Sequence, residues 1–299
     1  PSVLMAAMLG AMSSPWFDGF TAGFHEIDGL HLHARIGGRA DAPALLMLHG
    51  FPQTHAMWHR VAQQLAPHFR IVLPDLRGYG DSDKPRGEAG HANYSKRSLG
   101  HERYFVAGHD RGARVAHRLA LDHAGAVRRL ALLDIAPTLD MYEATDMRCA
   151  SAYYHWFHLI QPHPLPERMI GADPRFYQRA KLGGWGSKGT GYMEDEALAE
   201  YERCFCRPEA IHAVCEDYRA SAGIDLEHDR ASRAAGQRIA CDTRVLWGER
   251  GVVNALFDPL ALWQAQCSAA VSGHVMPAGH YIAEELPDET ARELRGFFV

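Results

Sequence analysis

One short stretch, residues 108–112 (Gly-His-Asp-Arg-Gly), constrains this 299-residue chain more than any other. It follows the apolar run 104–107 and precedes apolar residues at helical spacing, Val115 and Leu119, so we expect a strand, a sharp turn and a helix. The two glycines let strand and helix approach closely because neither carries a Cβ. Asp110 would then lie at the tip of the turn, where the free N–H groups of the helix favour an ionised carboxylate.

The aspartate points to a particular chemistry. Esterases and lipases place a serine at this turn, the nucleophile elbow, to attack carbonyl carbon. A carboxylate such as Asp110 can instead displace a leaving group from saturated carbon and form an ester that water cleaves. The motif therefore favours alkyl transfer, although Gly-x-Asp-x-Gly can also be a plain turn with a capping aspartate.

Two arginines beside the elbow suggest the substrate. Arg111 and Arg114 are three residues apart at the start of the predicted helix, so both guanidinium groups can lie on one face beside Asp110. Guanidinium groups bind carboxylates bidentately, which predicts a substrate with a carboxylate of its own. The alternative is a pair of surface arginines in salt bridges.

Composition excludes several classes of protein. With 47% apolar residues, 22% charged residues and a formal net charge of −5, the chain has the composition of a soluble globular protein, and no basic cluster suggests nucleic acid. The cysteines show no CxxC pairs, so we expect reduced thiols, as in the cytosol: Cys149, Cys204, Cys206, Cys215, Cys241 and Cys267. The 19 histidines contain no HExxH pattern, and no dinucleotide fingerprint occurs, so we predict neither metal nor organic cofactor.

The N-terminal part contains an apolar segment and a hairpin. Residues 3–12 are too short to span a bilayer and lack a basic flank, so we predict neither a membrane span nor a signal peptide. Residues 16–35 predict a hairpin, because residues 30–35 alternate. His31 and His33 would share one face of that strand as ordinary strand residues rather than metal ligands.

Further short apolar runs predict a parallel sheet. Residues 44–48 predict a buried strand, residues 57–65 a helix, 71–75 a strand, and 129–133 a strand that ends at Asp134. The turn at residues 49–52 predicts that the backbone N–H of Phe51 forms one half of an oxyanion hole, with that of Arg111 as the other half.

The composition of the chain changes after residue 136. Residues 137–240 are rich in aromatic residues, prolines and helical stretches, which predicts a helical cap inserted into a core of residues 16–136 and 241–299, with residues 1–15 as an apolar extension. The core resumes at 243–248, which we interpret as the final strand, and His280 follows. The expected order is nucleophile Asp110, acid Asp134 and base His280.

Four motifs make a family resemblance explicit. Residues 49–55 (HGFPQTH), 108–114 (GHDRGAR), 154–156 (YHW) and 215–220 (CEDYRA) resemble the fluoroacetate dehalogenases, which belong to the α/β-hydrolase superfamily. The likeness extends from about Phe17 to the C-terminus. Haloalkane dehalogenases are less similar, because they place a tryptophan where this chain has Arg111.

The resemblance implies a mechanism and a set of site residues. Arg111 and Arg114 would hold the carboxylate of a 2-haloacid, Asp110 would attack the halogen-bearing carbon, and His280, oriented by Asp134, would activate water to release a 2-hydroxy acid. It assigns halide binding to His155, Trp156 and Tyr218, which offer N–H and O–H donors. It also places Trp185 in the pocket and implies a cytoplasmic homodimer whose partner is a small haloacid, with no nucleic acid or membrane partner.

The chain departs from that family at one place. A helix normally separates the segments that residues 94–97 and 99–101 resemble, whereas here Ser98 alone lies between them. Losing that helix would expose apolar surface on the sheet. We therefore hypothesise that residues 3–12, or a partner subunit, cover the vacated groove.

Two other functions remain open from the sequence. An epoxide hydrolase would use the same nucleophile, acid and base, with Tyr153, Tyr154 or Tyr218 protonating the epoxide oxygen. A neutral epoxide has no need of two buried arginines, which favours the haloacid. A non-catalytic binding protein on this fold is disfavoured because Asp110, Asp134 and His280 are all present.

Overall fold

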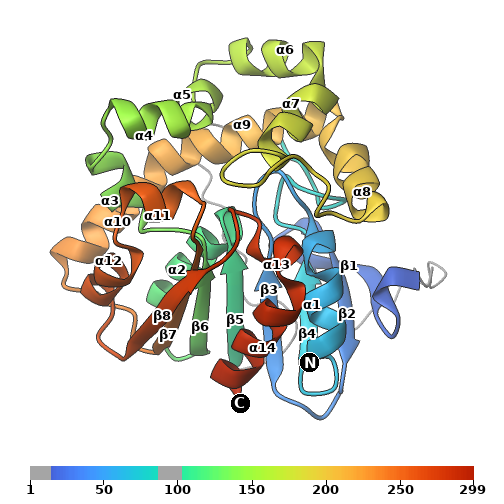
Figure 1. Ribbon diagram of the computed structural model, residues 1–299, viewed down its shortest axis with the longest axis vertical. Helices are drawn as coiled ribbons and strands as arrows, with labels where there is room; N and C mark the ends of the chain where they lie inside the picture. Colours follow the sequence, from blue (N-terminus) through green and yellow to red (C-terminus); the bar gives the residue numbers. More distant parts are fainter. Residues whose placement is uncertain (1–14, 87–102) are drawn as a thin grey trace.

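The protein is built on an eight-stranded, mostly parallel sheet. The computed structural model describes residues 15–86 and 103–299, and Figure 1 shows the sheet with helices around it and a helical layer at one end. The order across the sheet is β1-β2-β4-β3-β5-β6-β7-β8, with antiparallel pairing of β1 to β2 and of β2 to β4 and parallel pairing elsewhere. The strands are β1 Thr21–Ile27, β2 Leu30–Gly38, β3 Ala44–Leu48, β4 Arg70–Pro74, β5 Tyr104–His109, β6 Val127–Leu133, β7 Asp242–Gly248 and β8 Val271–Met276.

The central strands are apolar on both faces because helices cover both. In β5, Phe105 and Ala107 belong to one buried cluster, whereas Val106 belongs to a second cluster on the opposite face. This alternation follows from the two-residue period of a strand. A near-continuous apolar run is typical of a parallel strand buried on both sides.

Helices from both halves of the chain pack on the sheet. Helix α2 contacts β3, β5 and β6, and α12 contacts β7 and β8. On the other face α1 packs against α14. These helices are α1 His59–Leu65, α2 Arg111–Asp122, α11 Val252–Leu256, α12 Pro259–Gln266, α13 Ile282–Glu285 and α14 Pro287–Phe298, with short 3-10 helices η1 Pro15–Phe17 and η2 His55–Trp58.

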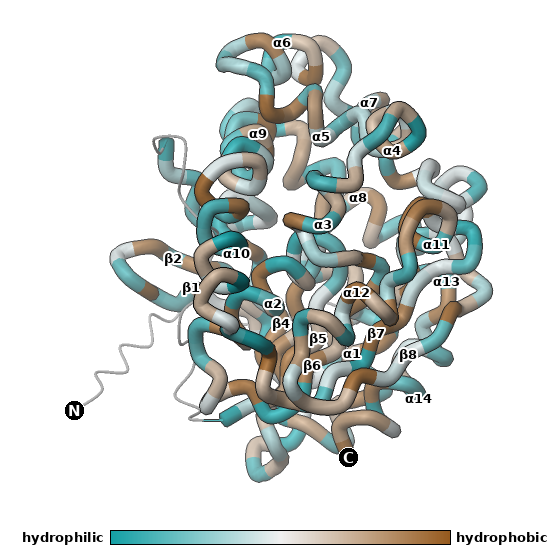
Figure 2. Tube along the Cα trace, turned by 90° about the vertical axis from the view of Figure 1, so that its left-hand side faces the viewer, coloured by the Kyte–Doolittle hydropathy of each residue, from teal (hydrophilic) through white to brown (hydrophobic). Residues whose placement is uncertain are grey.

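A helical layer lies between β6 and β7 in the chain. It comprises α3 Thr138–Glu143, α4 Met147–Ala152, α5 Tyr154–Leu159, α6 Leu165–Ala172, α7 Pro174–Leu182, α8 Asp195–Phe205, α9 Pro208–Ala222 and α10 Ile224–Ala234. Figures 1 and 2 place α4 to α9 beyond one end of the strands, so that this layer covers the loops there. We propose that residues 137–240 form the cap and that residues 16–136 and 241–299 form the core.

Most predicted elements are confirmed, and two details differ. The predicted helix over residues 57–65 divides into η2 and α1. Residues 243–248 are not the final strand, because β8 follows as the outermost strand of the sheet. Its sequence, VSGHVM, contains no apolar run, and half of its residues are exposed. An edge strand of this kind lacks the pattern by which a buried strand is predicted.

Several expectations concern other parts of the chain. Residues 3–12, the segments 94–97 and 99–101, and the groove hypothesis that links them lie outside the described residues. Among residues 15–86 and 103–299, no helix combines the length and apolarity that a membrane crossing requires.

The fold makes a testable prediction at the elbow. A Cβ on Gly112 would lie 2.3 Å from the carbonyl oxygen of His49 and 2.4 Å from that of Leu48, and backbone atoms cannot move away as side chains do. We expect Gly112→Ala to lower the free energy of unfolding by about 2–3 kcal/mol in urea titrations. The control is Gly171→Ala, in α6, where a Cβ meets nothing within 4 Å; equal stability of both variants would contradict this account.

Candidate active site

Asp110 occupies a strained turn between β5 and α2. Its backbone has φ 47° and ψ −117°, a conformation that residues with a side chain rarely adopt. The turn is held from both sides: its N–H donates to the carbonyl oxygen of Leu133, and its own carbonyl accepts from Ala113 and Arg114 at the start of α2. The side chain is therefore directed away from the sheet, and the residue is 8% exposed.

The backbone N–H of Phe51 binds the elbow carboxylate. It donates to Oδ1 of Asp110 at 2.8 Å, so the predicted donor does face the predicted nucleophile. The preceding residue must be a glycine, because a Cβ on Gly50 would lie 2.5 Å from the Cβ of Asp110. Gln178 of α7 donates to the carbonyl oxygen of Pro52 and so ties the same turn to the cap.

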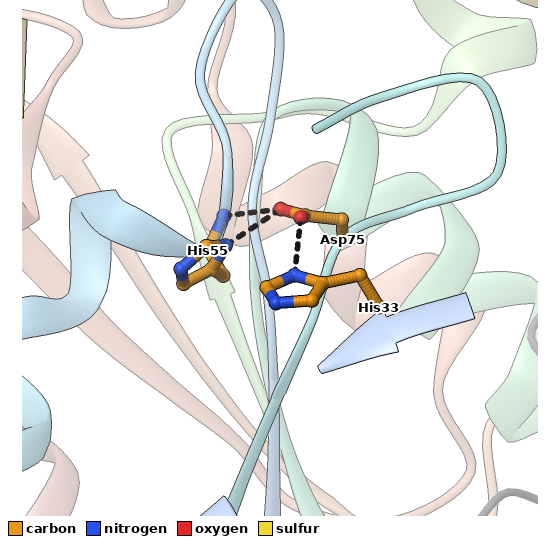
Figure 3. A group of neighbouring side chains, drawn as sticks. All are labelled: His33, His55 and Asp75. Carbon is orange, nitrogen blue, oxygen red and sulfur yellow. Dashed lines mark hydrogen bonds and ion pairs between the residues drawn. The ribbon is translucent and has the colours of Figure 1, made fainter. Parts of the chain in front are cut away.

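A buried cluster fixes the end of that turn. Figure 3 shows His33 of β2 and His55 of η2 pointing at Asp75, and each donates from Nδ1 to the carboxylate at 2.8 Å. Burial alone would raise the pKa of Asp75, but the two histidines hold it well below its usual range. The backbone N–H of His55 donates to the same carboxylate at 2.9 Å, which anchors the Phe51 turn to the sheet.

The same cluster has the composition of a metal site. The nitrogen and oxygen atoms of His33, His55 and Asp75 lie within 4.8 Å of one another. However, Nε2 of His55 accepts from Nε of Arg35 at 3.1 Å, so its Nδ1 carries the proton that goes to Asp75. A nitrogen that donates a proton has no lone pair for a metal, and the geometry is that of a hydrogen-bonded anchor. His31, by contrast, is exposed and hydrogen-bonds Asp83.

His280 and Asp134 form a buried pair beside Asp110. Nδ1 of His280 is 2.5 Å from Oδ2 of Asp134, whose other oxygen accepts from the N–H of Gly248 at 2.9 Å. Nε2 of His280 lies 4.0 Å from Oδ2 of Asp110 and has no hydrogen-bond partner among the described residues. That nitrogen can therefore face a water molecule next to the elbow carboxylate.

Asp110 and His280 each stabilise the charged form of the other. Burial alone would raise the pKa of Asp110, but His280, His109, Arg114 and the Phe51 N–H lower it to about 2. Burial likewise would lower the pKa of His280, but the hydrogen bond and charge of Asp134, with the charge of Asp110, raise it. At neutral pH Asp110 is an ionised carboxylate, the form that a nucleophile requires.

The two arginines have different partners. Arg111 forms a bidentate pair with Asp217 of α9, at 2.8 Å from Nε and 2.6 Å from Nη2. Its Nη1 donates to Ser221, and the hydroxyl of Tyr79 donates to the same Asp217 carboxylate. The fork of Arg111 that the sequence predicts for a substrate carboxylate is thus occupied by a protein carboxylate.

Arg114 has no such carboxylate. It is buried, donates from Nη1 to Thr138 Oγ1 at 2.9 Å and to the Ala136 carbonyl at 3.3 Å, and stacks 4.8 Å above the ring of Trp156. Among residues 15–86 and 103–299 no carboxylate lies within ion-pair distance of it, and its Nε has no partner. The charge of Asp110 acts on Arg114 from beyond ion-pair distance, so a carboxylate ligand in direct contact would offset more of the cost of burying this cation.

Two of the predicted halide residues, His155 and Tyr218, are in contact on the cap side of Asp110. His155 stacks on Phe51 with ring centroids 5.8 Å apart and meets Tyr218 at 5.6 Å. Nδ1 of His155 and the hydroxyl of Tyr218 are buried without partners in the described part of the chain. Trp185 lies 4.7 Å from His155 and 5.2 Å from His280, and Trp156 lies under Arg114. The arrangement therefore brings buried donors together above the elbow.

Sequence reasoning missed the residues that position this site. Asp217 lies within the motif at residues 215–220, but nothing in its pattern shows that it pairs with a residue 106 positions earlier. Asp75 is the last residue of a predicted strand, which is a weak signal, because carboxylates at strand ends often belong to sites. Gly50 carries no sequence signal of its role.

A nucleophile elbow, an acid–base pair and a backbone N–H at the carboxyl ends of parallel strands define a hydrolase of the α/β fold. Residues 43–179 match the family model of the alpha/beta hydrolase fold. The chain is 42% identical over 292 residues to the fluoroacetate dehalogenase of Burkholderia sp, with 94% of each chain covered. It is 30% identical to the soluble epoxide hydrolase of Corynebacterium sp. (strain C12), covering 91% of this chain and 95% of that one.

Structural similarity agrees with these matches. The solved structure of ALR0039 from Nostoc sp PCC 7120 superimposes with a TM-score of 0.90 at 48% identity, over 95% of this chain and 99% of that one. Within the α/β hydrolases, this chain belongs to the haloacetate dehalogenase-like family.

The site predicts how His280 titrates. Asp134→Asn removes the charge that raises the pKa of His280 but leaves its burial, so we expect NMR titration to show a lower pKa. A raised folded-state pKa stabilises the fold below about pH 6.5, and this stabilisation is lost as pH rises through the folded pKa. The variant should lack it. Asp242→Asn, an exposed change on β7, is the control; an unchanged pKa in Asp134→Asn would contradict the pairing.

Proposed function

We propose that this hydrolase removes halide from a 2-haloacid, such as chloroacetate or fluoroacetate, and releases the 2-hydroxy acid. The observation that carries the proposal is Arg114, a buried guanidinium beside the Asp110 carboxylate and without a carboxylate partner in the described structure. A substrate that brings its own carboxylate would supply that partner. The identity to a fluoroacetate dehalogenase supports the same substrate class.

The first step would be displacement at saturated carbon. Oδ1 of Asp110 is held by the Phe51 N–H, which leaves Oδ2, on the side of His280, as the attacking atom. A bond forms between Oδ2 and the carbon that bears the halogen, while the carbon–halogen bond breaks and the halogen leaves with the electron pair as halide. Arg114 would hold the carboxylate so that this carbon lies in line.

The second step would be hydrolysis of the aspartyl ester. Nε2 of His280 takes a proton from water as the water oxygen attacks Cγ of Asp110. The backbone N–H of Phe51, which already donates to Oδ1, would stabilise the negative charge on that oxygen, and we propose that the backbone N–H of Arg111 is the second donor. The bond from Cγ to Oδ2 then breaks, the product alkoxide takes the proton from His280, and one proton leaves to solvent as Asp110 returns to its ionised form.

The aromatic donors would receive the halide. Fluoride is a poor leaving group, so its departure depends on donors in a dry environment, and loss of one such donor costs about 3 kcal/mol. His155 and Tyr218 are buried, each with an unpartnered polar atom, and we propose that Trp156 joins them. Trp185 would close the pocket between His155 and His280.

Epoxide hydrolysis is the second candidate. Its specific support is the hydroxyl of Tyr218, which has no partner among the described residues and could protonate an epoxide oxygen, together with the 30% identity to an epoxide hydrolase. Arg114 argues against it, because a neutral epoxide leaves that buried guanidinium unpaired.

Halide release tests the proposal. We expect the wild type to release chloride from chloroacetate and fluoride from fluoroacetate, and Arg114→Met to lower kcat/KM about 50-fold, because a hydrogen bond to a charged group contributes about 1.5–3 kcal/mol. The control Arg148→Met removes an exposed arginine of the cap and should change nothing. Turnover of styrene oxide without release of either halide would favour epoxide hydrolysis. Release of chloride but not of fluoride would restrict the substrates to acids with the heavier halogens.

A further inference from the structure

Lys181 is a buried cation that does not belong to the site residues described above. It lies on α7 and is 4% exposed. Among residues 15–86 and 103–299, its ammonium group has neither a carboxylate within ion-pair distance nor a hydrogen-bond acceptor. Burial lowers the pKa of Lys181 to about 8, and no neighbouring acid offsets that effect.

Aromatic rings take the place of an acidic partner. Nζ lies 3.8 Å from the ring centroid of Tyr154 and 5.5 Å from those of Tyr177 and Trp185. Cation–π contacts of this kind stabilise an ammonium group but leave its three hydrogen-bond donors without a protein acceptor. We call these three rings and Lys181 the aromatic cage. Tyr154 is 49% exposed, so the cage reaches the molecular surface.

The inner side of the cage reaches the catalytic pair. Trp185 contacts Lys181 on one side, and its ring lies 5.2 Å from that of His280 and 4.7 Å from that of His155. The charge of Lys181 is close enough to His155 to lower the pKa of that imidazole further, beyond the effect of burial. A line of contacts therefore runs from the exposed Tyr154 through Lys181 and Trp185 to His280.

We propose that Lys181 contacts the substrate carboxylate on its way from solvent to Arg114. This inference rests on the proposed function. An anion that enters along the cage exchanges part of its water for the N–H donors of Lys181, so it loses its hydration in two stages, first at Lys181 and then at Arg114. A cationic group in a low-dielectric passage also raises the local concentration of anions, an effect that increases association rates by about 10- to 1000-fold. Lys181 thus acts on entry and exit, and Arg114 on the bound state.

The test measures exchange without turnover. In an Asp110→Asn background, 19F NMR lineshapes of fluoroacetate give its association and dissociation rates together with Kd. We expect Lys181→Met to lower both rates about tenfold while Kd stays within about twofold. Lys181→Arg should keep most of the rates, because the charge remains. Lys188→Met removes an exposed lysine seven residues further on and should match the background.

Each outcome decides between the two proposals. Rates of Lys181→Met equal to the background contradict the role of Lys181 alone. A weaker Kd with an unchanged association rate also contradicts it, because the residue would then act on the bound state or on packing. If Lys181→Met does not fold, Lys181→Gln takes its place. If neither fluoroacetate nor chloroacetate binds the background, the proposed function fails, and the inference with it.

Discussion

The site depends on the contact between the Phe51 N–H and Oδ1 of Asp110. This 2.8 Å hydrogen bond joins the turn after β3 to the turn after β5, and it fixes which carboxylate oxygen is free. Its formation requires a residue without Cβ at Gly50 and a strained backbone at Asp110, both of which the surrounding sheet enforces. Two contacts hold the turn after β3: the hydrogen bond from His55 to Asp75 ties it to the sheet, and the hydrogen bond from Gln178 to Pro52 ties it to the cap. The strain is thus supported by hydrogen bonds on either side of the site.

Charge pairing separates two arginines that look equivalent in the sequence. Arg111 and Arg114 are three residues apart on one helix, yet Arg111 forms an ion pair with Asp217, whereas Arg114 donates to neutral groups and has no carboxylate within ion-pair distance in the described structure. Lys181 likewise has no acidic partner within ion-pair distance in the described part of the chain, and aromatic rings contact its ammonium group. Folded proteins normally pair buried charges, so a site that keeps cations unpaired is suited to an anionic ligand. This reasoning favours a haloacid over an epoxide more strongly than the presence of two arginines does.

The sequence was sufficient for the elbow and for the parallel strands because both depend on local signals. Glycines around Asp110 and the short apolar runs of β3, β5 and β6 are visible without a partner. The strand β8 was missed because an exposed edge carries no apolar run, and the pairing of Arg111 with Asp217 was missed because it joins α2 to α9 across the cap boundary. Local patterns thus specify elements and candidate side chains, whereas the state of a charge depends on which distant residue folds against it.

The central claim is that Asp110 forms a covalent ester with the substrate. A single turnover of chloroacetate in H2(18)O, with enzyme in excess, followed by mass analysis of the peptide that contains Asp110, tests it most directly. Because water attacks Cγ and the bond to Oδ2 breaks, the account predicts that one 18O atom enters the Asp110 carboxylate and that the first hydroxyacetate released is unlabelled. Label in the product and none in Asp110 would show that water attacks the substrate carbon itself, and would contradict the account.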